Sequence, residues 1–178
     1  MVESVAARRQ KADPRLAESA ARIFAVNDRL NQILITNLDP SVWKAQPPGK
    51  VRTIAAIFAH MHNVRTKWIR LTAPHLGVPA QLNRARCTPS ETRKALAKSA
   101  DQCGKMLAEA LGGEGRVKEF RRDGWARPCP AGPEMLCYMI SHEAHHRGQI
   151  AMLAHQLGFP LPGKVTSESW NWEKLLKL

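Results

Sequence analysis

Aromatic residues, cysteine pairs and long apolar runs are all scarce in this chain of 178 residues. Aromatic residues make up 6% of it and tyrosine occurs once, which argues weakly against an all-β fold. No apolar run approaches the ~20 residues that span a bilayer, so we expect no contact with a membrane. The chain is long enough to bury one core without covalent cross-links, which predicts a single domain.

The cysteines do not form a Cys-x-x-Cys pair; they are Cys87, Cys103, Cys129 and Cys137. The opening stretch MVESVAARRQKADPR is basic, but the apolar segment of a secretory signal does not follow it. We therefore expect reduced thiols and a cytoplasmic protein. We interpret residues 1–14 as a flexible basic lead-in.

Basic residues are in excess, with 27 Lys and Arg against 15 Asp and Glu and a net charge of +12. They are scattered along the chain, and no helix-turn-helix, zinc-finger or RNA-binding signature accompanies them. A solvated basic surface is the favoured interpretation. A site that attracts anionic small molecules is the next, and nucleic acid is not expected as a partner.

Apolar residues recur at helical spacing in four segments, and we expect a helix in each: residues 15–37, 51–72, 88–111 and 133–157. The third segment begins with a capping box, because Thr88 is a good N-cap and Glu91 follows it three residues later. No segment predicts a strand convincingly. The pattern therefore predicts an all-α fold, a four-helix bundle over residues 15–160.

Two segments that connect helices and one C-terminal extension complete the predicted architecture. Residues 73–87 can extend over about 50 Å, more than the ~33 Å length of the second helix, so a long crossover could make the second and third helices parallel. Residues 112–131 are rich in Gly, Arg and Pro, and we expect an irregular, exposed loop. Residues 161–178 are expected to form a C-terminal extension packing on the bundle, with one short helix capped by Ser167.

Histidine is concentrated in the stretch SHEAHHRGQIAML, residues 141–153. Because each helical residue turns by about 100°, His142 and His146 lie one turn apart on the apolar face of the fourth predicted helix. Two imidazoles at this spacing can both bind one metal ion. The alternative is a pair of buried histidines with hydrogen-bond partners, and we favour the metal. His145 points toward an edge of the helix.

The second predicted helix offers a third ligand in the stretch FAHMHNVRTKW, residues 58–68. His60 and His62 point about 200° apart, so only one of them can face the metal. The apolar stripe lies midway between them and does not decide. Val64 borders the side of His60 and Arg65 borders that of His62, so the neighbours modestly favour His60.

The stretch from His142 to His146 also matches H-E-x-x-H, the signature of zinc proteases in which the glutamate is the general base. Such proteases need a further ligand, which usually lies downstream, where no good candidate is found, and no sheet edge is predicted to hold a peptide. We therefore expect the match to be coincidental. Glu143 is expected to be hydrogen-bonded, or paired with an arginine such as Arg147.

Two strings together, AHMHNVRTKW at residues 59–68 and HEAHHRGQI at residues 142–150, resemble the DinB/YfiT-like family of small metalloenzymes. The resemblance covers roughly residues 15–160. It implies an up-down-down-up four-helix bundle and a divalent nickel or zinc ion held by His60, His142 and His146. It also implies a homodimer. The family does not require a glutamate at position 143.

The resemblance also implies a chemistry. Three histidines leave an open position on a divalent metal, where a water acquires a pKa near ~7 or a thiol is deprotonated. Characterised relatives transfer or isomerise small-molecule substrates with thiols such as bacillithiol, mycothiol or glutathione. We therefore expect a thiol transferase or isomerase, and a basic surface would suit an anionic thiol. A metal-dependent hydrolase and a non-catalytic metal-binding stress-response protein remain alternatives.

Further side chains are expected around the metal without binding it: Gln149, Arg147, Glu143 and Arg65. Gln149 is expected to orient a ligand histidine. The two arginines border the expected site, although either could instead form hydrogen bonds between helices. The loop at residues 112–131 is expected to border the mouth of the site, together with Trp170 and Trp172.

Overall fold

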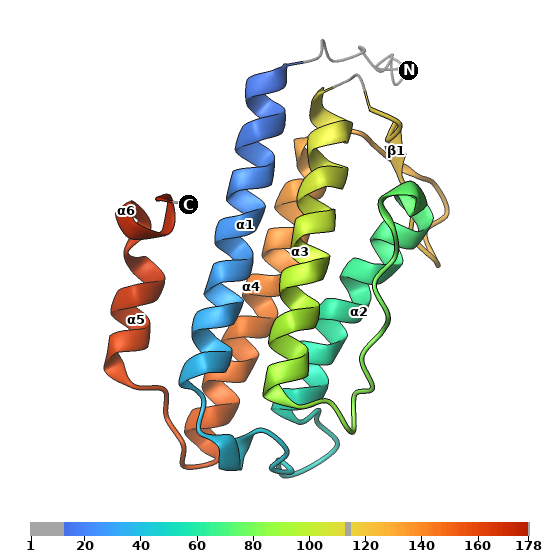
Figure 1. The fold of residues 1–178 in the computed structure, drawn as a ribbon. Coiled ribbons are helices and arrows are strands. Elements are labelled where there is room, and N and C mark those ends of the chain that lie inside the picture. The colour runs from blue at the N-terminus through green and yellow to red at the C-terminus, as the bar shows by residue number, and fades with distance from the viewer. Residues whose placement is uncertain (1–12, 113–114, 178) are drawn as a thin grey trace, which may run out of the picture.

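The structure is a computed structural model that describes residues 13–112 and 115–177. It is mostly helical, which confirms the prediction of an all-α fold. Long helices lie side by side in Figure 1: α1 Pro14–Asn37, α2 Ile54–Thr72, α3 Pro89–Gly112 and α4 Pro133–Gln156. No helix among the described residues is both long and apolar enough to cross a membrane. Apart from its last two residues, the lead-in predicted for residues 1–14 lies outside the described part.

Side-chain caps determine where α2 and α3 begin. Thr53 caps α2 by accepting a hydrogen bond from Ala56 N at 3.2 Å, so α2 begins later than predicted. The capping box predicted for α3 is confirmed: Thr88 Oγ1 accepts from Glu91 N at 3.2 Å, and Glu91 Oε2 accepts from Thr88 N at 2.9 Å. Both caps satisfy backbone N–H groups that a helix start leaves without a partner.

The link from α2 to α3 runs along the helices instead of turning tightly (Figure 1). It opens with a 3-10 helix, η2 Pro74–Leu76, and then returns to the end of the molecule at which α2 begins. Asn63 of α2 holds this link, because its Nδ2 donates to Leu82 O at 3.0 Å and its Oδ1 accepts from Leu82 N at 2.8 Å. The link from α1 to α2 contains another 3-10 helix, η1 Pro40–Val42.

The segment between α3 and α4 was predicted to be irregular and exposed, and most of its described residues are exposed, but it is not irregular throughout. Its described part contains two short antiparallel strands, β1 Glu119–Phe120 and β2 Cys129–Pro130. Val117 and Phe120 are 2% and 0% exposed and pack into the apolar core. Burial of these two side chains ties the segment to the helices, whereas Trp125 between the strands stays exposed.

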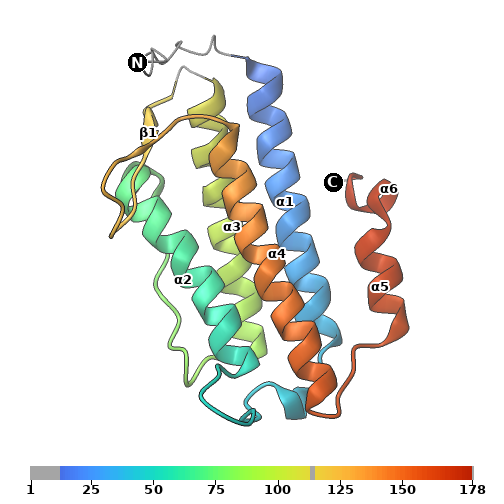
Figure 2. The same cartoon turned by 180° about the vertical axis from the view of Figure 1, so that it is seen from behind.

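Two short helices follow α4 and lie along α1, on the side away from α2 (Figures 1 and 2). They are α5 Gly163–Trp170 and α6 Trp172–Leu175. The prediction of one helix capped by Ser167 is wrong, because Ser167 lies inside α5 and Asn171 caps α6 with its side chain. Val165 and Leu175 are buried, which attaches both helices to the rest of the fold.

Buried side chains form two apolar clusters with a polar layer between them. The first cluster includes Phe24, Trp68, Leu107, Phe120 and Met135. The second includes Leu34, Trp43, Phe58, Leu96 and Ile150. Each long helix contributes buried polar side chains near the junction of the two clusters: Asn27, Asp28 and Asn31 on α1, Arg65 on α2, Ser99 on α3 and Glu143 on α4.

Arg65 and Glu143 form an ion pair at the centre of this polar layer. Arg65 Nε donates to Glu143 Oε1 at 2.6 Å and Nη2 donates to Oε2 at 2.7 Å, while Nη1 donates to Asp28 Oδ1 at 2.8 Å. Asn27 and Asn31 each donate to Glu143 Oε2 at 2.7 Å. Burial alone would raise the pKa of Glu143, but the Arg65 guanidinium lowers it below its ordinary value, so the carboxylate is charged.

This ion pair yields the first prediction. Arg65→Met should lower the free energy of unfolding by about 3–5 kcal/mol, because Glu143 and Asp28 would be left buried without their cation. Urea denaturation followed by circular dichroism measures the change. The matched control is Arg70→Met, which removes an exposed ion pair with Asp123 and should cost below about 1 kcal/mol. Equal losses in the two variants would contradict the central role of the buried pair.

Candidate metal centre

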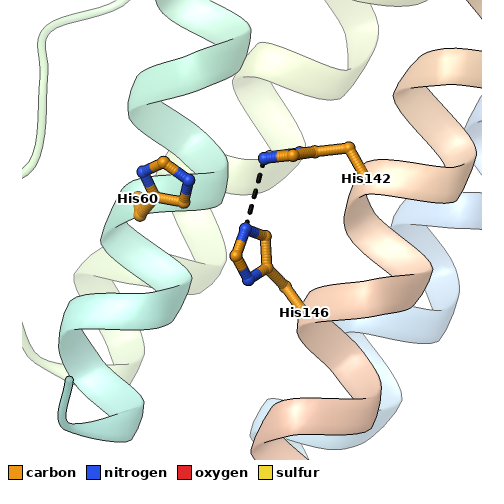
Figure 3. Close-up of side chains that lie close together, drawn as sticks. All are labelled: His60, His142 and His146. Atoms are coloured by element: carbon orange, nitrogen blue, oxygen red, sulfur yellow. Dashed lines mark hydrogen bonds between the residues drawn. The ribbon is translucent and has the colours of Figure 1, made fainter. Parts of the chain in front are cut away.

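Three histidines meet between α2 and α4. His60 comes from α2, and His142 and His146 come from α4 and point toward it (Figure 3). One ring nitrogen from each histidine lies within 4.8 Å of the others. The structure therefore brings together the three histidines that the sequence and its resemblance singled out.

The distance between the two histidines of α4 fits a shared ion. His142 Nε2 and His146 Nε2 are 3.2 Å apart. Two tetrahedral ligands that each lie ~2.05 Å from one zinc ion are about 3.3 Å apart. The same distance permits one hydrogen bond between two neutral imidazoles, so it accommodates the pair with or without an ion.

The His60 ring is not satisfied by hydrogen bonds within the described part of the protein. Its Nδ1 is buried and has no hydrogen-bond partner among the described residues. A buried polar atom without a partner costs free energy, and native structures contain few of them. A water or another group beside this nitrogen would supply the partner that the described residues do not.

The three imidazoles are uncharged at neutral pH. Burial, followed by repulsion from His146, lowers the pKa of His60 from 6.5 to about 3. The same two causes lower the pKa of His142 to about 4, and burial also lowers the pKa of His146. Metal binding requires neutral imidazole, so no proton has to be displaced at pH 7.

Gln149 orients one histidine of the cluster. Its Oε1 lies 2.7 Å from His146 Nδ1, so it accepts a hydrogen bond from that nitrogen. The proton is then on Nδ1, and Nε2 of His146 is left with its lone pair toward His142 and His60. Histidines that bind metals are commonly oriented in this way by a hydrogen bond at the other ring nitrogen.

Two further histidines nearby lie outside the cluster. His62 is fully buried and points toward α3, with Nδ1 at 3.1 Å from Ser99 Oγ and Nε2 at 2.8 Å from Ala80 O. His145 is exposed, and its Nε2 lies 3.0 Å from the side-chain nitrogen of Gln149. Both ring nitrogens of His62 are therefore already engaged within the protein.

Three of the side chains expected around the metal belong instead to the contacts between helices. Among the described residues, no hydrogen bond joins Arg65, Glu143 or Arg147 to the clustered histidines. Glu143 pairs with Arg65, while Arg147 lies 4.0 Å from it and donates to Asn27 Oδ1 at 2.8 Å. The expected pairing of Glu143 with Arg147 is thus secondary, because Arg65 approaches the carboxylate with two nitrogens.

An aromatic group beside His142 went unrecognised in the sequence. Tyr138 stacks on His142 with ring centroids 6.2 Å apart, and Arg122 donates a hydrogen bond to the Tyr138 hydroxyl. Trp68 and Trp125 complete the group, each 5.9 Å from the Arg122 guanidinium. Tyr138 was recognisable, since it lies one helical turn before His142. Arg122 was not, because it lies in a loop.

The expectation that Trp170 and Trp172 border the mouth of the histidine site is wrong. Both line a cavity with α1 and a different face of α4. They lie there because α5 and α6 pack along α1, whereas the histidines occupy the α2 side of α4 (Figures 1 and 3). The loop between β1 and β2 does lie close by, through Arg122 and Trp125.

The arrangement can hold one divalent cation with three neutral nitrogen ligands, which leaves a coordination position for a further molecule. A family model described as the DinB family matches residues 10–171, a range that includes the three histidines. No curated protein and no solved structure matches the chain.

The lowered pKa values yield a prediction for the metal-free protein. His60 and His142 have a pKa of 6.5 in the unfolded chain, whereas folding lowers the pKa to about 3 for His60 and to about 4 for His142. The unfolded state therefore binds more protons, and stability should be lost as the pH falls from 6.5 toward 4. The urea concentration at which half of the protein is unfolded should fall as the pH is lowered. It should fall less steeply in the double variant His60→Gln, His142→Gln than in the wild type. Parallel curves would show that these two histidines do not cause the loss.

Proposed function

The chain belongs to the DinB family, and we propose on this premise that it is a metal-dependent enzyme that transfers or isomerises a small molecule with a low-molecular-weight thiol. The observation that carries the proposal is the cluster of His60, His142 and His146, with three neutral imidazoles and no fourth protein ligand among the described residues. A closed structural site would be expected to supply four protein ligands.

The residues of the chain prepare this site in different ways. His60, His142 and His146 would hold a nickel or zinc ion, and Gln149 keeps His146 in the tautomer that can bind it. When bound, such an ion is a Lewis acid that lowers the pKa of a thiol or a water. Tyr138 lies nearly parallel to the His142 ring and forms the neighbouring wall on that side of the cluster.

Positive charge near the cluster supports an anionic thiol as the co-substrate. Burial and the neighbouring His146 are the two largest causes that lower the pKa of His60. The positive charges of Arg52 and Arg84 lower it further. Arg122 has the same effect on His142, after burial and neighbouring charges. Arginines close to a buried site attract carboxylates such as those of glutathione.

The wider expectations about the molecule belong to the same proposal. The course of the link after α2 supports an up-down-down-up bundle over residues 15–160, with residues 1–14 and 161–178 as additions to it. All four cysteines are free thiols, which supports a cytoplasmic location. A homodimer is proposed from the family resemblance, and sedimentation analysis tests it.

The metal ligands yield a prediction. His60→Ala, His142→Ala and His146→Ala should each reduce bound nickel or zinc per chain to a small fraction of the wild-type value, since one of three ligands is lost. Elemental analysis after desalting measures the content. His145→Ala is the matched control on the same helix and should retain full occupancy. Retention of the metal by His60→Ala would remove His60 from the ligand set.

The thiol yields a separate prediction. Of glutathione, bacillithiol and mycothiol, at least one should raise the melting temperature of the zinc-loaded protein, whereas its S-methyl derivative should not, because the thioether has no proton to lose. Arg122→Gln should weaken binding of that thiol by about ten-fold, the loss of one charge-assisted hydrogen bond. Equal binding of thiol and thioether would contradict the proposal.

Activity assays on the metal-loaded protein would distinguish the alternatives. Hydrolysis of an activated ester that depends on the metal, without a response to any thiol, identifies a hydrolase. Metal binding without either activity identifies a non-catalytic metal-binding protein. Neither alternative has a specific observation in its favour at present.

A further inference from the structure

A cavity lies on the opposite side of α4 from the histidines. It has a volume of about 420 Å³, is open to solvent, and is lined by α1, α4 and the two short helices α5 and α6. Small-molecule sites commonly measure about 300–1,000 Å³. None of the three clustered histidines lines this cavity, so it is separate from the candidate metal centre.

Most of the lining is apolar. Aliphatic side chains of α1 form one wall and include Ile23, Leu30 and Leu34, while Trp170 and Trp172 form the rim. Trp170 is 75% exposed and Trp172 is 43% exposed. Two exposed indoles beside a concave apolar wall are unfavourable in water, and covering such a surface is favourable.

One charged side chain, Arg147, interrupts the apolar lining. It is 14% exposed, and its Nη1 donates to the amide oxygens of Asn27 at 2.8 Å and Asn31 at 3.0 Å. The nearest carboxylate, that of Glu143, is 4.0 Å away and is already bound by two nitrogens of Arg65. Nε and Nη2 of Arg147 form no hydrogen bond with another described residue, so they remain available for a ligand.

We propose that this cavity binds a small amphiphilic carboxylate, with its hydrocarbon chain against α1 and the two tryptophans and its carboxylate on Arg147. The charge of the ligand follows from Arg147, whose two remaining nitrogens suit an incoming carboxylate. The apolar part follows from the lining.

Gly148 offers a way to fill the cavity without disturbing the fold. It lies on α4 beside Arg147 and lines the cavity, and a Cβ added there would meet no atom within 4 Å. A larger side chain at this position extends into empty space, and replacing a glycine inside a helix removes a destabilising residue. Gly148→Leu should therefore fold and occupy the volume that the ligand needs.

Calorimetric titration of the full chain with decanoate tests the proposal. Decan-1-ol, which has the same chain without the charge, and acetate, which has the charge without the chain, should both bind at least about ten-fold more weakly. Gly148→Leu should abolish decanoate binding. The matched control is Ala97→Leu, which adds the same side chain to an exposed position in a hollow between α1 and α3 and should leave the affinity unchanged.

Arg147→Gln removes the positive charge from the cavity and leaves its apolar lining in place. It should lower the affinity for decanoate by about ten-fold and leave that for decan-1-ol unaltered, provided that circular dichroism shows a native helical content. Equal binding of decanoate and decan-1-ol to the wild type overturns the assignment of Arg147. If Gly148→Leu binds decanoate as tightly as the wild type does, the ligand does not bind in this cavity and the proposal is overturned. The proposal is also overturned if the wild type is a dimer that does not bind decanoate and Gly148→Leu dissociates this dimer. This face of the protein would then bind a second copy of the chain.

Discussion

The buried ion pair between Arg65 and Glu143 sets the orientation of α4 against its neighbours. Glu143 directly follows His142, so its two bonds to Arg65 and its bonds to Asn27 and Asn31 fix the rotation of α4 about its axis. Successive helical residues turn by about 100°. Once Glu143 points into the polar layer, the histidines face α2 and Arg147 faces α1. The helix α4 therefore presents the imidazole nitrogens of His142 and His146 on one side. On its other side it presents the guanidinium of Arg147 to the apolar cavity.

The same ion pair explains why a protease signature occurs here without protease geometry. In H-E-x-x-H proteases the glutamate is the general base beside the metal. Glu143 is 2% exposed, and its oxygens are occupied by Arg65 and two asparagines. Its lowered pKa gives it little tendency to take a proton at neutral pH. Glu143 holds helices together, and the groups left to bind a metal ion are the three imidazoles.

Helical periodicity was sufficient to predict the four long helices, and the spacing of His142 and His146 was sufficient to place both on one face. The sequence favoured His60 over His62 only through its neighbours and the family resemblance, because the apolar stripe of α2 lies between the two. The structure adds the packing reason, since Ser99 of α3 engages His62. The position of Arg122 depends on a loop that Val117 and Phe120 anchor, which local sequence does not encode. The docking of α5 on α1 likewise depends on a long-range contact, and it carried Trp170 and Trp172 away from the histidines.

The central claim is that three imidazoles from two helices hold one divalent ion with a position open to a thiol. X-ray absorption spectroscopy of the zinc-loaded or nickel-loaded chain tests it most directly. The account predicts three imidazole nitrogens, which for zinc lie at about 2.0–2.1 Å, with one or more exchangeable oxygen ligands and replacement of one of them by sulfur when the thiol is added. A shell of oxygen ligands without imidazole, a cysteine sulfur in the protein without added thiol, or four protein nitrogens would contradict it.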